Sequence, residues 1–185
     1  LDSLTMDFQR GTGSSEKFEG CMVSSMTISC EAGGEASLSV DILAETAQTR
    51  TTAISPSFGS GVQVFHHQVT TAGLSFDSVN YKIRSFEFSL DNKLERVNNL
   101  GSKLTGQPQI SDVREVTITA TLDLEDNNLY NAQIAGTQGS VQVVFTNGSQ
   151  TMEFLLRNAK IIDYSDDVNS FGRIERTVTF MGLGV

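Results

Sequence analysis

The chain has 185 residues, and its 22 acidic and 13 basic side chains give a formal net charge of −9. Hydrophobic residues make up 38% of the sequence, which is enough for a core, and the length is typical of one domain. The composition excludes a collagen-like chain and a disulfide-rich scaffold, the acidic charge argues against a surface that grips duplex nucleic acid, and no apolar run approaches the roughly 18–20 residues that cross a bilayer.

The N-terminal third of the chain combines predicted strands with two polar stretches. Residues 1–20 are mostly polar, and we expect them to form an arm. Alternating apolar residues then predict strands at 22–30 and 38–44, with one buried and one exposed face each. Residues 44–61 form an 18-residue connection, and connections of that length in a compact domain are usually functional or disordered. Four side chains give this loop the means to dock on another surface: Arg50, Ile54, Pro56 and Phe58.

The remainder of the chain is dominated by the same alternation. It predicts strands at 86–90, 116–124, 141–145, 152–156, 158–162 and 174–180. The dipeptide Asn147-Gly148 between two of them is a strong hairpin signal. Strands separated by turns throughout predict a mainly β fold, an antiparallel β-sandwich or partly closed barrel, built as a single domain over residues 1–185.

One short α-helix interrupts the strands. Asp126 can cap a helix over 127–135, and Gly136 suits the position just after its C-terminus. Leu129 and Ile134 offer an apolar side, so we expect this flanking helix to pack on the sheets.

Residue patterns for catalysis or metal binding are missing from the sequence. Cys21 and Cys30 flank one predicted strand and would lie about 30 Å apart when extended, so we expect free thiols rather than a disulfide. His66 and His67 are adjacent, and neighbours on a strand point to opposite faces, so they cannot share a metal ion. The acidic stretch 163–172 lacks the glycine and glutamate of a calcium loop and is better explained as a solvated turn. We expect no enzyme activity, no cofactor and no metal site.

The faces of four predicted strands that point away from the core share an unusual composition. Their fifteen positions hold five acids, ten hydroxyl residues and no lysine or arginine, and we call them the hydroxyl-and-acid face. They are Ser25, Thr27, Ser29, Ser37, Ser39, Asp41, Ser85, Glu87, Ser89, Asp91, Glu115, Thr117, Thr119, Thr121 and Asp123. The corresponding positions of the later strands, such as Arg157 and Glu175, mix charge signs.

Two interpretations of this face remain open. Many antiparallel sheets have an ordinary solvated side. Such sides usually carry lysines, however, which keep the protein soluble and block edge pairing. A face of small hydroxyls and acids repels anions and is suited to a wall along which a polyanion slides without sticking.

A set of segments, taken in this order, resembles the phage tail tube protein family, the major tail proteins of long-tailed bacteriophages. Three segments of this chain resemble the opening hairpin of that family: FEGCMVSSMTI at 18–28, Gly33-Gly34 and the strand at 38–44. The segment SFEFSLDN at 85–92 resembles its central strand. Its second half resembles the strand at 116–124, the helix with Leu129-Tyr130, Gly136-Thr137, the strand at 141–145 and Asn147-Gly148.

The resemblance implies a structural virion protein. Six copies would form a ring whose inner sheets join into one barrel, and stacked rings would form the tube that conducts DNA during ejection. The long loop at 44–61 would reach the adjacent ring, and the arm at 1–20 would bridge subunits. The hydroxyl-and-acid face would line the lumen, with Asp41, Glu87, Asp91, Glu115 and Asp123 supplying its charge.

The same resemblance implies the partners and the location. Besides copies of itself, the protein would contact tail terminator and tail-tip proteins. The lumen would hold the tape measure protein and genomic double-stranded DNA, which would pass without sequence-specific binding. No membrane is involved; the protein would be assembled in the bacterial host cytoplasm and reside in the virion tail.

Two other classes are open at this stage. One is a different ring-forming component, such as a terminator, a distal tail protein or a type VI secretion tube protein, which would share the sheet plan. The other is a β-sandwich binding module, for example for carbohydrate. That class needs exposed aromatic platforms, and the chain has no tryptophan and three tyrosines: Tyr81, Tyr130 and Tyr164.

Overall fold

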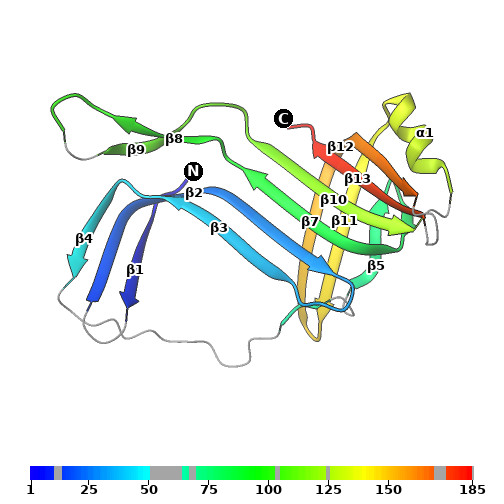
Figure 1. The fold of residues 1–185 in the computed structure, drawn as a ribbon, viewed down its shortest axis with the longest axis horizontal. Coiled ribbons are helices and arrows are strands. Elements are labelled where there is room, and N and C mark those ends of the chain that lie inside the picture. Colours follow the sequence, from blue (N-terminus) through cyan, green and yellow to red (C-terminus); the bar gives the residue numbers. More distant parts are fainter. Residues whose placement is uncertain are drawn as a thin grey trace. The chain divides into compact units, whose positions relative to one another are not determined.

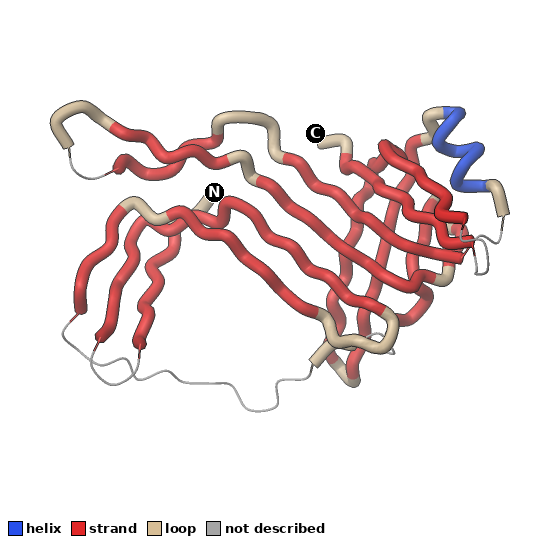
Figure 2. Tube along the Cα trace, in the orientation of Figure 1, coloured by secondary structure: helices blue, strands red, loops and turns tan. Residues whose placement is uncertain are grey.

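The computed structural model of the protein describes residues 1–10, 14–50, 64–66, 70–102, 105–123, 126–168 and 174–184. These residues form antiparallel strands and one short helix, which confirms the predicted mainly β class (Figure 2). They divide into two compact units. Unit 1 comprises Leu1–Met26, Val40–Val62 and Asp91–Arg114, and unit 2 comprises Thr27–Ser39, Gln63–Leu90 and Glu115–Val185.

Unit 1 contains a three-stranded sheet around the start of a long strand. Strands β1 (Leu4–Arg10) and β4 (Thr46–Arg50) pair with the first part of β2 (Ser14–Glu31), as Figure 1 shows. In this register, Met6 and Ala47 both lie opposite Phe18. Residues 1–20, expected to form an arm, therefore carry β1 and the beginning of β2. The loop expected at 44–61 begins with β4. A separate hairpin is formed by β8 (Leu94–Asn98) and β9 (Thr105–Ile110).

Unit 2 contains most of the strands that the sequence predicted. The additional elements are β5 (Thr70–Phe76) and β6 (Val79–Tyr81), and the others are β7 (Ile83–Asp91), β10 (Glu115–Asp123), β11 (Gln138–Asn147), β12 (Gln150–Val168) and β13 (Ile174–Gly182). The strand order is β2–β7–β10–β13–β12–β11–β5–β6, and β3 (Ser37–Leu43) pairs with β2. The hairpin predicted at Asn147-Gly148 joins β11 to β12, and the strands predicted at 152–156 and 158–162 are one strand.

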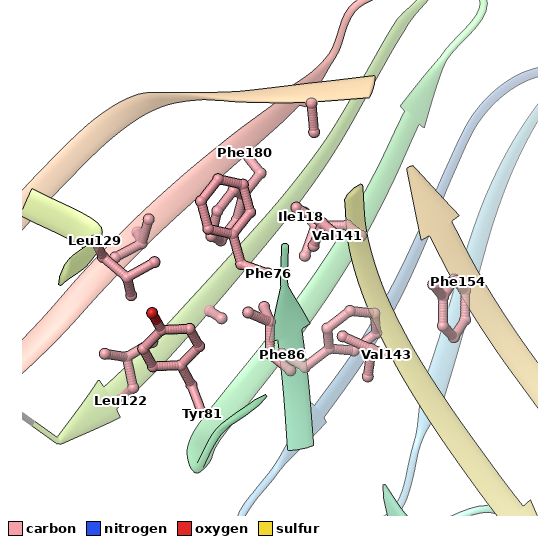
Figure 3. Close-up of a cluster of buried hydrophobic side chains, with 14 of the residues drawn as sticks. Phe76, Tyr81, Phe86, Ile118, Leu122, Leu129, Val141, Val143, Phe154 and Phe180 are labelled. Carbon is pink, nitrogen blue, oxygen red and sulfur yellow. The ribbon is translucent and has the colours of Figure 1, made fainter. Parts of the chain in front are cut away.

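The core of unit 2 lies between two parts of this sheet. Phe86 of β7 packs against Phe145 of β11 and Phe154 of β12, with ring centroids 5.7 and 5.1 Å apart. Since β7 is not adjacent to β11 or β12 in the strand order, the sheet folds back over a shared core, as in a sandwich. Figure 3 shows Phe86 and Phe154 together with Ile118 of β10 and Phe180 of β13, which belong to the same buried cluster. Burying this apolar surface is the main stabilising term of unit 2.

Both cysteines of the chain lie on β2. Both Cys21 and Cys30 are buried free thiols, as expected from their spacing. Burial raises the pKa of Cys30, with a smaller contribution from neighbouring Glu31. A buried thiol with a raised pKa is a poor nucleophile.

Helix α1 (Asn128–Ala135) forms where the sequence predicted a helix, with one error in its packing. Gly136 ends it in the left-handed conformation at φ 65°, as predicted. Leu129 is buried, but Ile134 is exposed, so the predicted apolar side is wrong. Residues five apart lie on different sides of a helix with about 3.6 residues per turn. No helix among the described residues is long and apolar enough to cross a membrane.

The start of α1 is held on the sheet by a buried cation. Arg176 of β13 donates from Nε to Asp166 of β12 at 2.9 Å and from Nη1 to the carbonyl oxygen of Asp126 at 2.6 Å. Its guanidinium lies 4.6 Å from the ring centre of Tyr164. The acidic stretch beginning at Asp163 is therefore not a solvated turn, because its residues up to 168 are the end of β12 and Asp166 pairs with the buried arginine.

Candidate functional site

The hydroxyl-and-acid face follows the predicted strands in both units. Twelve of its fifteen residues belong to unit 2, and Ser25, Asp41 and Asp91 belong to unit 1. In unit 2, the face residues of β10 alternate with buried Ile118 and Leu122, so they lie on the side of the sheet away from the core. The alternation that the sequence displays therefore places this side of β10 toward solvent in the isolated chain.

Hydroxyl groups on this face bond to one another across neighbouring strands. The Oγ1 atoms of Thr119 and Thr179 are 3.2 Å apart, and those of Thr121 and Thr177 are 3.4 Å apart. The Oγ atoms of Ser29 on β2 and Ser37 on β3 are 2.9 Å apart. Hydroxyls that pair with each other have fewer free donors for other ligands.

Strand β13 extends the face, which the sequence analysis did not predict. Thr177 and Thr179 lie directly opposite Thr121 and Thr119, and Glu175 lies opposite Asp123. The sequence interpretation grouped the polar side of this strand with surfaces of mixed charge. Only the pairing with β10 identifies it as a continuation of the same face.

In unit 2 a cation, Arg84 of β7, lies beside this face. Ile83 and Phe86 both contact the core although they are three positions apart, so alternation is interrupted between them. Arg84 consequently reaches the hydroxyl-and-acid side, where its Nε donates to Asp123 Oδ1 at 2.7 Å and its Nη1 to Glu175 Oε1 at 3.2 Å. The hydrogen bond to Asp123 raises the pKa of Arg84. Arg84 is not one of the fifteen residues that define the face, and the structure adds it beside them.

Two of the proposed lumen acids in unit 1 also have close partners. Asp41 accepts a hydrogen bond from Ser25 Oγ at 2.6 Å. Asp91 forms an ion pair with Lys93 at 2.7 Å and accepts from the Lys93 backbone N–H at 2.8 Å, and the side-chain bond to Lys93 lowers the pKa of Asp91. In unit 2, Glu87 and Glu115 are exposed on neighbouring strands.

The loop residues expected to dock elsewhere are only partly described. Arg50 is the last residue of β4. Ile54, Pro56 and Phe58 lie outside the described residues, as does His67. His66 forms an isolated bridge with Glu35, and the described part of the chain contains no group of three His, Cys, Asp or Glu side chains that could hold a metal ion.

Comparison with known proteins agrees with these features. A search of curated protein sequences finds no match. The family model described as phage tail tube protein matches residues 2–182, which is nearly the whole chain. The antiparallel β architecture is consistent with that match, and the chain belongs to the phage tail tube protein family, whose members are structural components of the virion tail.

Proposed function

We propose that six copies of this chain form a closed ring, that the rings stack into the tail tube, and that the hydroxyl-and-acid face lines its lumen. The observation that carries the proposal is the composition of that face in unit 2. Its exposed groups are carboxylates and small hydroxyls, and such a wall repels the phosphate backbone of DNA at short range. DNA and the tape measure protein would pass along it without sequence-specific binding, and the protein would act in self-assembly rather than catalysis.

Ring closure is supported by the edge of the sheet at β3. Among the described residues, β3 pairs only with β2. The bond between Ser37 and Ser29 marks one side of this strand, so Leu38 points to the other side, where it is 63% exposed. The alternation had predicted a buried Leu38, but the core of the isolated chain does not extend beneath it. An unpaired strand edge with an exposed apolar side chain promotes aggregation of a monomer. In a closed ring the same edge can pair with the neighbouring subunit.

Ring stacking is supported by the three-stranded sheet of unit 1. Leu4, Met6 and Phe8 of β1 alternate along one side of this sheet, and Leu4 and Phe8 are about half exposed. Phe8 meets Phe18 edge-to-face with centroids 6.2 Å apart. The arm at 1–20 contributes β1 to this sheet, and the loop at 44–61, which carries Arg50, Ile54, Pro56 and Phe58, contributes β4. Both segments expected to reach other subunits are therefore anchored in the same sheet.

Electron microscopy of the purified protein is the direct test. We expect tubes of indefinite length; single rings would instead identify a terminating component, and monomers would contradict the proposal. Leu38→Lys should abolish tubes, whereas Leu155→Lys on the interior strand β12, which replaces a leucine that is 39% exposed, should not. Deletion of Thr49–Ser57 should leave a folded chain that forms no long tubes.

The lumen assignment has a separate test by cysteine labelling. Both native cysteines are buried, so an added cysteine gives a clean signal. Glu87 and Glu153 are exposed on layers that face away from each other across the core, because Phe86 and Phe154 pack between them. In assembled tubes, Glu87→Cys should react with a small maleimide and resist one attached to a bulky polyethylene glycol, and Glu153→Cys should react with both. Equal reaction of both variants with the bulky reagent would refute the lumen assignment.

A further inference from the structure

The Arg84 cluster of unit 2 combines one cation with two carboxylates on a surface that otherwise repels anions. Arginine is the side chain best suited to bind phosphate, because its planar fork donates two parallel hydrogen bonds. A free arginine on the lumen wall would therefore be a point of adhesion for a passing nucleic acid. The side chain of Arg84 is 35% exposed, so burial does not remove it from contact with such a ligand.

Carboxylates occupy every nitrogen of this guanidinium. Nε and Nη2 donate to the two oxygens of Asp123 at 2.7 and 3.5 Å, and Nη1 donates to Glu175 at 3.2 Å. Asp123 thus fills the fork of Nε and Nη2, and Glu175 already engages Nη1 of the other fork. One carboxylate would neutralise the cation, and the second makes the cluster net negative.

We propose that Asp123 and Glu175 mask the positive charge of Arg84, so that the hydroxyl-and-acid face offers no free cation to a DNA backbone, a role that rests on the tube function proposed above. Lys93 in unit 1 shows the same arrangement independently, since Asp91 holds its ammonium group at 2.7 Å. The five proposed lumen acids thus do not all act as free repelling charges. Asp123 and Asp91 act by covering cations.

A purely structural role for the cluster predicts something different. If the ion pairs served only to hold β7, β10 and β13 together, loss of the carboxylate charges would change stability and leave DNA affinity unchanged. The double variant Asp123→Asn/Glu175→Gln separates the two roles. Both amide oxygens can still accept hydrogen bonds from Arg84, whereas the masking charge is gone.

The test measures binding of a fluorescently labelled 30-base-pair DNA duplex by anisotropy, at low and at physiological salt. The parent protein should bind weakly or not at all. The double variant should bind about tenfold more tightly or better at low salt, and the gain should fall as salt rises, because binding through phosphate releases counterions. Adding Arg84→Gln to the double variant should return affinity to the parent value.

A matched control removes the same number of negative charges without uncovering a cation. Asp77→Asn/Glu153→Gln makes the same change in net charge at two exposed acids of unit 2 that are not among the proposed lumen residues. We expect its affinity to stay within about twofold of the parent value, since distant surface charges are screened. Circular dichroism checks the fold of each variant. If the double variant does not fold, the single variants decide: Asp123→Asn should gain more affinity than Glu175→Gln because its contact with Arg84 is shorter.

Three results would overturn the proposal: no gain in the folded variants, a gain that survives Arg84→Gln, or an equal gain in the control. Anisotropy reports binding to monomers, rings and tubes alike, and electron microscopy of the same samples reports assembly. Tubes without a gain in DNA affinity would refute the masking and leave the tube function standing. A gain in DNA affinity without tubes would support the masking and refute the tube function.

Discussion

Replacing the buried Arg176 by methionine should destabilise unit 2 substantially. The side chain is 2% exposed, and methionine can fill much of its volume while losing the ion pair to Asp166, the bond to the Asp126 carbonyl and the contact with Tyr164. Removing one member of a buried pair costs about 3–5 kcal/mol. Asp166 is 36% exposed, so water can solvate its carboxylate, and we expect a loss at the low end, about 3 kcal/mol.

Urea unfolding followed by far-ultraviolet circular dichroism measures this loss, since the chain has no tryptophan for fluorescence. In a domain of this size, the melting temperature should fall by about 6–12 °C. Amide hydrogen exchange gives a local readout, because exchange in α1 should accelerate once the Asp126 carbonyl loses its donor. The matched control is Arg157→Met at an exposed position of β12, which should change stability by less than about 0.5 kcal/mol. A loss for Arg176→Met no larger than the control's would refute the importance of this network.

Two further predictions concern the backbone at Gly73 and the side chain of Tyr164. Gly73 has φ +71°, and a Cβ there would lie 2.3 Å from the Tyr81 carbonyl oxygen. Gly73→Ala should therefore lower the free energy of unfolding, measured in urea, by more than about 2 kcal/mol. The control Gly101→Ala, also at positive φ but with open space around it, should lower it by about 1 kcal/mol. Burial raises the pKa of Tyr164 to about 12 from an ordinary 10.0, so its contribution to stability is complete below pH 10 and is lost as pH rises toward 12. Tyr164→Phe should therefore flatten the fall in unfolding free energy over that range, and an unchanged slope would contradict the shift.

Local patterns along the chain were sufficient to predict many elements. Alternation identified β10 and β13 because a strand with one buried side repeats every two residues. The hairpin at Asn147-Gly148 and the helix end at Gly136 followed from conformations that glycine adopts easily. Strands β5 and β9 were missed because their segments, TTAGLSF and TGQPQI, contain glycine or proline and alternate poorly. Their pairing with neighbouring strands compensates for weak local preference.

The candidate face was predictable in part, for a related physical reason. The composition of one side of a strand is a local property, so the sequence alone determined that β2, β3, β7 and β10 present hydroxyls and acids opposite their apolar residues. Which strands lie side by side is not local, and only the tertiary structure added Thr177 and Thr179 to the face. An interruption of alternation in β7 likewise brought Arg84 to Asp123, because a strand changes its register to fit neighbours that come from distant parts of the chain.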